Sequence, residues 1–341
     1  IVYFRRMRTR LTVKCKMHKA LKKVLVTGGA GFIGSHLVDR LITQNYEVTV
    51  FDNLSSGSLK NLEKWLHKRN FTFIKGDLKN PKSVEKAFQK ADVDLVFHFA
   101  ANPEVRVGET DPRIHFEENL LATFNLLEVA RKNRSARAIV FASTSTVYGE
   151  ATVFPTPEDY GPSIPISTYG ASKQGAEALM TSYAYTFDMR ALILRFANIV
   201  GPRATIGVIL DFIRKLRENS SRLEVLGDGA QKKSYLYIDD CVDAIFYAVN
   251  KFLKGNERVD IYNLGSADQL SVKRIAQVVA EEMGIPPPKL IFTGGVDGGR
   301  GWKGDVKTMH LSIEKLLKTG WKPKHKSEEA VRLTARKLLN A

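Results

Sequence analysis

The 341-residue sequence has few of the features that define several protein classes. Its two cysteines, Cys15 and Cys241, are too few for a disulfide framework and lack the spacing of a zinc site. The seven histidines show no ligand spacing either, so we expect no metal site. No run approaches the roughly 18 consecutive apolar residues of a membrane-spanning helix. We therefore expect a cytoplasmic globular protein with reduced thiols and no membrane partner.

Acidic residues are scarce compared with basic ones, and the imbalance is uneven. The formal net charge is +16, and Ile1–Ala20 carries seven Arg and Lys and no acid, which leaves +9 on the other 321 residues. Residues 1–20 lack the apolar core of a secretory signal, and we interpret them as a disordered basic tail. A transit peptide or a nucleic-acid-binding arm is the alternative, although we expect no nucleic-acid partner. The charge of the rest suits an anionic ligand such as a nucleotide diphosphate, or is simply a basic surface.

The most informative stretch is a glycine-rich turn. It follows a β-rich apolar run at residues 23–27 and precedes an amphipathic helical pattern at 36–42. Gly29, Gly31 and Gly34 fit a Gly-x-Gly-x-x-Gly spacing, and Gly28, Gly31 and Gly34 fit a Gly-x-x-Gly-x-x-Gly spacing. In this context bare backbone and a helix N-terminus can approach a pyrophosphate. The pattern predicts a dinucleotide site, although a plain structural turn has the same spacing.

A second predicted strand, residues 47–52, ends in an acid, Asp52, 18 residues after Gly34. A carboxylate there can accept both hydroxyls of the adenosine ribose and would repel a 2′-phosphate, which favours NAD over NADP. Residues 71–77 repeat the strand-then-acid pattern, so Asp77 and Leu78 are expected near the adenine. For both acids, the alternative is a solvated strand-end or loop residue.

Strand and helix patterns alternate over the first 200 residues. Strands are predicted at 23–27, 47–52, 71–76, 94–100, 138–143 and 191–196, and helices at about 32–44, 82–90, 116–133 and 169–187. This alternation predicts an α/β fold with a Rossmann-type, doubly wound parallel sheet. Glycine and proline loops interrupt shorter elements further on. We therefore predict an NAD-binding domain at 21–200 and a smaller, mainly substrate-binding domain at 201–341, with residues 259–264 returning a strand to the large sheet.

Tyr169 and Lys173 are four residues apart in a predicted helix and share a face. A free tyrosine, with a pKa of about 10, is a poor base at neutral pH. A nearby ammonium and a positive nicotinamide ring would both favour the phenolate, so Tyr169 is a candidate general base towards an alcohol. The alternative is an ordinary Tyr/Lys pair on a helix surface.

A cluster of hydroxyls, Ser143, Thr144 and Ser145, ends the predicted strand at 138–143. Open α/β sheets bind ligands at the carboxyl ends of their strands, so one of these hydroxyls could bond the substrate oxygen and share its proton. His98 lies in an apolar predicted strand, and we interpret it as a core residue with satisfied ring nitrogens rather than a ligand.

Taken in order, these motifs resemble the extended short-chain dehydrogenase/reductases, specifically nucleotide-sugar epimerases of the UDP-glucose 4-epimerase type. The resemblance covers about residues 21–340. Its matching segments are 27–37, 52–57, 98–101, 143–149, 169–173, 195–203 and 227–231.

The resemblance implies a catalytic set of Thr144, Tyr169 and Lys173. It implies NAD as cofactor, held by Gly28, Gly31, Phe32, Ile33, Gly34, Asp52, Asn53, Asp77, Leu78, Ala100, Tyr169 and Lys173. The implied substrate is a nucleotide sugar, with UDP-hexose expected. Its implied contacts are Ser143, Ser145, Asn198, Lys233, Arg300 and Met309.

Three of these sugar-side residues depart from the family pattern or have an ambiguous register. Lys233 occupies the place of a family arginine, so it keeps the charge and loses the bidentate fork. Arg300 is the nearest match to a late diphosphate-binding arginine, and Lys303 is its alternative. Met309 falls at the position that gates the 2-substituent of the sugar, or is a core residue.

The family mechanism implies that Tyr169 takes the proton of the sugar 4-hydroxyl while NAD takes hydride from C4. The 4-keto sugar turns over, and the hydride returns to its other face. A 4,6-dehydratase would have Asp-Glu where Ser145 and Thr146 stand, which disfavours dehydration. A decarboxylase or uronate epimerase remains open. A non-catalytic NAD-sensing or nucleic-acid-binding relative is disfavoured by the Tyr/Lys pair, which such relatives commonly lose.

The family also implies a homodimer in which the helices at 116–133 and 169–187 pair with their copies. The first helix has an apolar stripe that could serve such an interface or pack within one subunit: Phe116, Leu120, Phe124 and Leu127.

Overall fold

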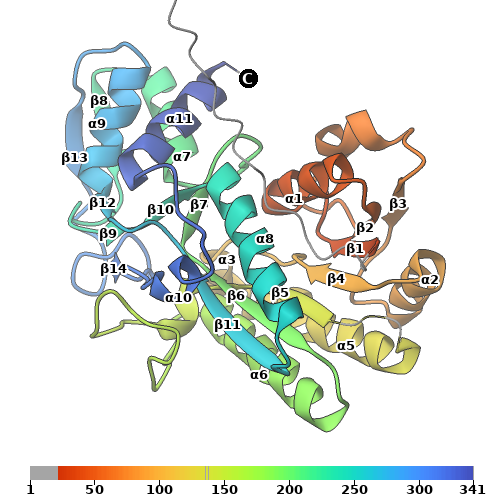
Figure 1. The fold of residues 1–341 in the computed structure, drawn as a ribbon. Coiled ribbons are helices and arrows are strands. Elements are labelled where there is room, and N and C mark those ends of the chain that lie inside the picture. The colour runs from red at the N-terminus through yellow and green to blue at the C-terminus, as the bar shows by residue number, and fades with distance from the viewer. Residues whose placement is uncertain (1–21, 135, 137, 341) are drawn as a thin grey trace, which may run out of the picture.

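The computed structural model describes residues 22–134, 136 and 138–340. Its centre is a seven-stranded sheet in the order β3–β2–β1–β4–β5–β6–β11 (Figure 1). Every neighbouring pair in it is parallel. The strands are β1 (Lys23–Thr27), β2 (Glu47–Asp52), β3 (Phe71–Lys75), β4 (Leu95–His98), β5 (Ala138–Thr144), β6 (Ala191–Phe196) and β11 (Val259–Leu264). The predicted doubly wound sheet is confirmed, whereas the predicted tail, 1–20, lies outside the described residues.

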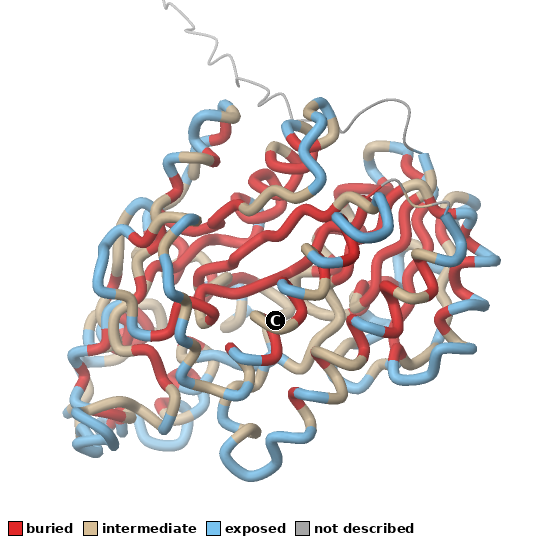
Figure 2. The backbone as a smooth tube through the Cα atoms, turned by 90° about the horizontal axis from the view of Figure 1, so that it is seen from below, coloured by how far each residue is buried: buried red, intermediate tan, exposed pale blue. Residues whose placement is uncertain are grey.

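Each face of the sheet has its own helices, because successive residues of a strand point to opposite sides. Val24 and Val26 belong to one core, covered by α1 (Phe32–Thr43) and α8 (Ile238–Lys254). Leu25 belongs to the other, covered by α2 (Pro81–Ala91), α5 (Ala122–Asn133) and α6 (Thr168–Thr186). Figure 2 shows the strands of the central sheet buried between these layers.

The helix predicted at 116–133 is not one regular helix. The short α4 (Pro112–His115) leads into a π-helical stretch, η2 (Phe116–Leu121), and α5 begins only at Ala122. Sequence periodicity does not reveal such a local widening of the helix, because the apolar spacing changes little across it. The remaining short segments before α6 are η1 (Leu59–Trp65), α3 (Val107–Thr110) and η3 (Ser145–Tyr148).

The C-terminal part adds three small sheets beside the large one: β7–β10, β12–β9–β14 and β8–β13. Their strands are β7 (Asn198–Val200), β8 (Arg222–Val225), β9 (Lys232–Lys233), β10 (Tyr235–Tyr237), β12 (Leu270–Ser271), β13 (Lys289–Phe292) and β14 (Thr308–Met309). The helices are α7 (Val208–Glu218), α9 (Val272–Glu282), α10 (Glu314–Leu317) and α11 (Ser327–Leu339). In Figure 1, α7, α9 and α11 gather to one side of the large sheet.

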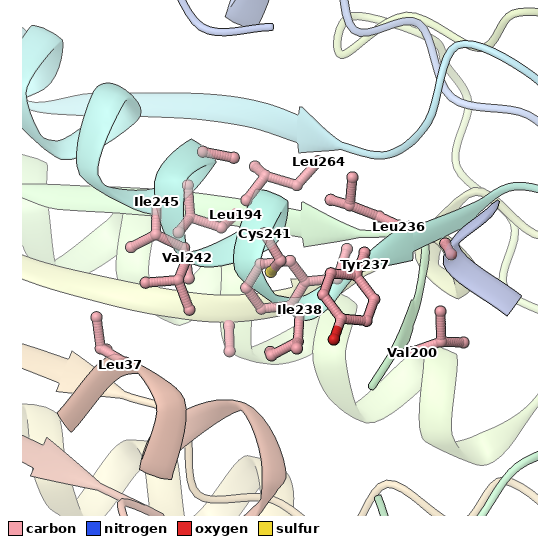
Figure 3. Close-up of a cluster of buried hydrophobic side chains, with 14 of the residues drawn as sticks. Leu37, Leu194, Val200, Leu236, Tyr237, Ile238, Cys241, Val242, Ile245 and Leu264 are labelled. Carbon is pink, nitrogen blue, oxygen red and sulfur yellow. The ribbon is translucent and has the colours of Figure 1, made fainter. Parts of the chain in front are cut away.

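Two C-terminal elements return to the large sheet. β11 pairs with β6 along its whole length, from Val259 opposite Ala191 to Leu264 opposite Phe196. Figure 3 shows α8 contributing Cys241 and Ile245 to a buried cluster that also holds Leu37 of α1. The Cys241 thiol is fully buried, which raises its pKa and makes it an inert core residue. Within the described chain, no helix has both the length and the apolar character needed to cross a bilayer.

Candidate active site

The glycine turn links the end of β1 to the start of α1. Gly28 has a φ of +70°, and a Cβ added to it would lie 2.6 Å from the backbone nitrogen of Ala100. A Cβ on Gly34 would collide with the carbonyl oxygen of Gly28. The turn therefore requires glycine at both positions, and it leaves bare backbone at the N-terminus of α1, where Phe32 and Ile33 form the first turn. This arrangement fits a dinucleotide pyrophosphate.

Asp52 ends β2 directly beside this turn. One oxygen of its carboxylate accepts the Ala30 N–H at 3.0 Å, and the other accepts the Leu54 N–H at 2.8 Å. The side chain is buried, and burial raises its pKa although both hydrogen bonds lower it. Asp52 thus joins the glycine turn to the end of β2, at the position where a ribose carboxylate is needed.

The predicted adenine side is also assembled. The Asn53 amide donates to Asp77 at 3.4 Å, and Leu78 is buried, with its carbonyl oxygen accepting from Asn125 at 2.9 Å. The ends of β2 and β3 therefore meet beside the glycine turn. The chemistry and shape of these residues fit NAD.

Tyr169 and Thr144 are brought together by α6 and β5. The N-cap of α6 is Ser167, whose hydroxyl accepts the Gly170 N–H at 3.1 Å and fixes the first turn that carries Tyr169. The phenol makes a hydrogen bond with the hydroxyl of Thr144, which lowers the phenol pKa, but burial outweighs it and raises the pKa to about 12. In the protein without cofactor, desolvation therefore dominates and holds the phenol protonated.

Lys173 lies in α6 one helical turn after Tyr169. Its Nζ donates to the carbonyl oxygen of Ala142 at 2.9 Å and lies 4.8 Å from the ring centre of Phe141. Burial lowers the Lys173 pKa to about 7, although Glu177 opposes the shift. The amine therefore titrates near neutral pH instead of carrying a permanent charge.

The three hydroxyls at the end of β5 have different surroundings. Thr144 accepts the Thr146 N–H at 3.2 Å and meets Tyr169. Ser143 faces the opposite side and donates to the buried carboxylate of Glu177, which is paired with Arg195 at 2.7 Å. The structure therefore does not bring Ser143 to the Thr144 side, since strand alternation turns it away. Ser145 is buried at the start of η3.

The predicted sugar-side residues come from the small sheets and their loops. Asn198 in β7 makes a side-chain hydrogen bond to Tyr235, whereas Lys233 and Met309 stand opposite each other across β9 and β14. Met309 is 6% exposed and belongs to a buried cluster with Val147, Tyr148, Ala197, Val306 and Leu311.

Both predicted diphosphate cations have acidic partners that the sequence reasoning missed. Lys233 Nζ lies 2.6 Å from the carboxylate of Asp305, and Arg300 lies 2.8 Å from that of Glu150. Lys303, the alternative to Arg300, is exposed. The ion pair of Asp305 with Lys233 spans 72 positions, so no local pattern reveals it. In the described part of the chain, no three His, Cys, Asp or Glu residues are grouped to hold a metal ion.

Comparisons with known proteins identify the family of the chain. The model of the NAD-dependent epimerase/dehydratase family matches residues 24–265. A solved UDP-galactose 4-epimerase is 46% identical, with a TM-score of 0.82 over 93% of this chain and 98% of that chain. A Thermus thermophilus UDP-glucose 4-epimerase in complex with NAD is 33% identical, with a TM-score of 0.81 over 93% of this chain and 99% of that one. UDP-glucuronic acid decarboxylase 3 of Arabidopsis thaliana is 32% identical over 91% of this chain and 87% of its own length.

Proposed function

The chain belongs to the NAD-dependent epimerase/dehydratase family, as an extended short-chain dehydrogenase/reductase of the nucleotide-sugar epimerase type, and we propose that it is a UDP-hexose 4-epimerase. Its proposed reaction interconverts UDP-glucose and UDP-galactose. The observation that carries the proposal is the Tyr169–Thr144 hydrogen bond at the carboxyl end of β5, with Lys173 one helical turn away. The similarity to the two 4-epimerases supports the choice of reaction.

The family's cofactor is NAD, which when bound accepts a hydride from C4 of the sugar and returns it. Gly28, Gly31 and Gly34, with the first turn of α1 at Phe32 and Ile33, would hold the pyrophosphate. Asp52 would bind the adenosine ribose. The adenine and nicotinamide ends would contact Asn53, Asp77, Leu78, Ala100, Tyr169 and Lys173.

Tyr169 is the residue proposed to transfer the proton. Because burial holds the free phenol protonated, with a pKa of about 12, its ionisation needs positive charge nearby. Lys173 supplies such a charge when protonated, and the oxidised nicotinamide adds another. The phenolate then accepts the proton of the sugar 4-hydroxyl and gives it back when the 4-keto group is reduced. The hydroxyl of Thr144 donates to the phenolate oxygen of Tyr169 and stabilises its negative charge.

The substrate diphosphate is an anion, so we expect it to bind to cationic side chains of the small sheets and their loops. Lys233 and Arg300 are the proposed contacts, and in the free protein Asp305 and Glu150 neutralise them. Asn198 would contact the diphosphate, Ser145 and Ser143 are the further proposed sugar contacts, and Met309 is proposed to limit the 2-substituent. Of these, Ser143 has the weakest support, because its hydroxyl is committed to Glu177.

A decarboxylase is the second candidate, because the similarity to UDP-glucuronic acid decarboxylase 3 extends over 91% of this chain. A 4,6-dehydratase is disfavoured, since Ser145 and Thr146 replace the two acids that remove water. A non-catalytic relative is disfavoured by the assembled Tyr169–Thr144 pair. The proposal places the enzyme in the cytoplasm as a homodimer, with residues 21–200 binding NAD and 201–341 mainly binding substrate.

Product analysis separates these reactions. The purified protein is incubated, without added NAD, with UDP-glucose, UDP-galactose, their N-acetyl forms and UDP-glucuronic acid in turn. We expect UDP-glucose and UDP-galactose each to give the same mixture of the two. Loss of carbon dioxide from UDP-glucuronic acid would identify the decarboxylase, and a 4-keto-6-deoxy sugar would identify the dehydratase. If none of the sugars changes, the result would support a non-catalytic relative.

A further inference from the structure

His98 ends β4 at the centre of the sheet and is 1% exposed. Its Nδ1 lies 2.8 Å from the hydroxyl of Thr27, its cross-strand neighbour in β1. Its Nε2 lies 2.9 Å from the hydroxyl of Thr123 in α5. Both ring nitrogens are therefore satisfied, which confirms the interpretation of His98 as a core residue. The ring also stacks on Phe141, with centroids 5.6 Å apart.

The hydrogen bonds on either side assign the proton of the ring. The Thr123 hydroxyl donates to the carbonyl oxygen of Asn119 at 2.6 Å, and a carbonyl can only accept. The Thr123 oxygen must then accept from His98, so Nε2 carries the hydrogen. Nδ1 is left as an acceptor for the Thr27 hydroxyl, whose oxygen accepts the Ala100 N–H at 3.4 Å. Every donor in this path points the same way, from Ala100 to Asn119.

The imidazole stays neutral in this setting. Burial lowers the His98 pKa to about 3, and the charge of Lys173 contributes in the same direction. A second ring proton on Nδ1 would also leave the Thr27 hydroxyl without its acceptor. One tautomer is therefore fixed over the whole physiological pH range.

The two ends of the path reach the two halves of the active site. Thr27 immediately precedes Gly28, whose turn packs against the backbone of Ala100. At the other end, the path stops at the backbone carbonyl of Asn119, and the side-chain amide of the same residue donates to the Ser172 hydroxyl at 3.1 Å. That hydroxyl donates to the carbonyl oxygen of Tyr169 at 2.8 Å. Two runs of hydrogen bonds that share Asn119 thus link the glycine turn to the first turns of α6.

We propose that His98 is a positioning residue that couples the glycine turn to the catalytic helix through its two buried hydrogen bonds and the rigid Asn119 that links them to α6. The inference depends on the proposed function for its turnover readout, whereas its cofactor readout does not. Its consequence is that removing a hydroxyl on the α5 side weakens cofactor retention, and removing one on the glycine-turn side slows the chemical step. Each removal leaves a buried ring nitrogen without a partner, which is costly wherever water cannot replace it.

The decisive variant is Thr123→Val, which keeps the shape of the side chain and removes its hydroxyl. Thr334→Val in α11 is the matched control, because Thr334 is equally buried and its hydroxyl donates to the carbonyl oxygen four residues back, Ala330, at 2.7 Å. Release of bound NAD from the purified protein is followed against an excess of labelled NAD. We expect Thr123→Val to release NAD on the order of tenfold faster, and Thr334→Val to match the wild type. Equal release from both variants would overturn the coupling.

The turnover readout uses Thr27→Val and the Thr27→Val/Thr123→Val double variant at saturating NAD. We expect Thr27→Val to lower kcat on the order of tenfold with an unchanged KM for the sugar. The double variant should be no worse than the poorer single variant, since both act through one imidazole. Losses that multiply would show two independent structural effects and would refute the path.

Substitution of the imidazole itself gives an independent check. His98→Gln offers an amide N–H towards Thr123, His98→Asn offers an amide oxygen towards Thr27, and His98→Phe keeps only the stacking on Phe141. NAD release and thermal unfolding are measured for each. We expect the two amides to retain NAD better than His98→Phe does. A folded His98→Phe with wild-type NAD release would overturn the proposal, and if it fails to fold, Thr123→Val decides. Normal NAD coupling without sugar turnover would contradict only the proposed reaction.

Discussion

The side-chain nitrogen of Lys173 donates to the carbonyl oxygen of Ala142, and this 2.9 Å bond joins α6 to the end of β5. Thr144, two residues after Ala142, makes a hydrogen bond with the phenol of Tyr169. The base and the hydroxyl that assists it are thus fixed relative to each other from two directions. With the Lys173 pKa lowered to about 7 and that of Tyr169 raised to about 12, the free site is close to neutral charge and depends on its ligands for activation.

The first prediction concerns the base. Tyr169→Phe removes the proton acceptor and should lower kcat by at least about 10², while NAD stays bound because the glycine turn is untouched. Tyr183→Phe is the control, since Tyr183 lies in the same helix and its hydroxyl donates to Glu128 at 2.7 Å, away from Thr144. Steady-state rates of Tyr169→Phe close to those of Tyr183→Phe would remove Tyr169 from this role.

The second prediction concerns pH and Lys173. Its folded pKa of about 7 lies below the value of 10.5 that it has when exposed, so between these values the unfolded state binds the extra proton. The wild type should therefore gain stability as the pH rises from 7 towards 10.5. Lys173→Met removes this term, so the variant should be more stable than wild type at pH 6 and lose that advantage by pH 10. Urea unfolding at pH 6, 8 and 10 measures the free energies. Parallel pH curves would mean that the amine is not desolvated.

The third prediction concerns the choice of cofactor. Asp52 is buried and its pKa is already raised by desolvation, so a second anion beside it is disfavoured. The cofactor extracted from purified protein should be NAD, and Asp52→Ser should improve the affinity for NADP relative to NAD by about tenfold or more. Chromatography of the extract and titration of both cofactors test this. Mainly NADP in the wild-type extract would contradict the assignment of Asp52.

The fourth prediction concerns the size of the sugar. Met309→Ser should raise kcat/KM for N-acetyl substrates relative to the plain UDP-hexoses by about 5- to 150-fold, because a shape contact of this kind is worth roughly 1–3 kcal/mol. Leu311→Ala is the control, since Leu311 belongs to the same buried cluster. If both variants shift the ratio equally or not at all, Met309 is a core residue without a gating role.

The fifth prediction concerns assembly. Phe116 and Phe124 are 56% and 42% exposed, whereas Leu127, expected in the same stripe, is 1% exposed and packs inside the subunit. A homodimer would cover the two phenylalanines, so the Phe116→Lys/Phe124→Lys variant should have the mass of a monomer by light scattering. Ile206→Lys, on an equally exposed residue near α7, should leave the dimer intact. A wild-type monomer at micromolar concentration would refute the dimer.

The sequence predicts most of the large sheet because its signals are local. Apolar runs such as 23–27 and 191–196 have the length and composition of buried strands, and Gly28 marks its own turn by the backbone it must adopt. The small sheets have no comparable signal. β9 and β14 are two residues long each, and pairings between distant positions, such as Lys233 with Met309 76 positions away, make them strands.

The candidate site is predictable in its residue types and less so in their surroundings. Spacing indicates Tyr169 and Lys173, and position at a strand end indicates the hydroxyl cluster, from which the family resemblance selects Thr144. The pKa of Tyr169 depends on how deeply the surrounding chain buries it, which no local pattern contains. The buried carboxylate of Glu177 that accepts from Ser143 is paired with Arg195 from the neighbouring strand, and the acidic partners of Lys233 and Arg300 lie far along the chain.

The position of β11 at the edge of the large sheet has a consequence for synthesis on the ribosome. β6 is complete once Phe196 has emerged, but its partner along the open edge ends only at Leu264. In between, the nascent chain carries a largely apolar strand edge and an α1 face without α8, both of which invite pairing with other chains. Six of the seven strands of the large sheet are thus translated before the strand that closes its edge, so that edge stays open while the intervening residues are made.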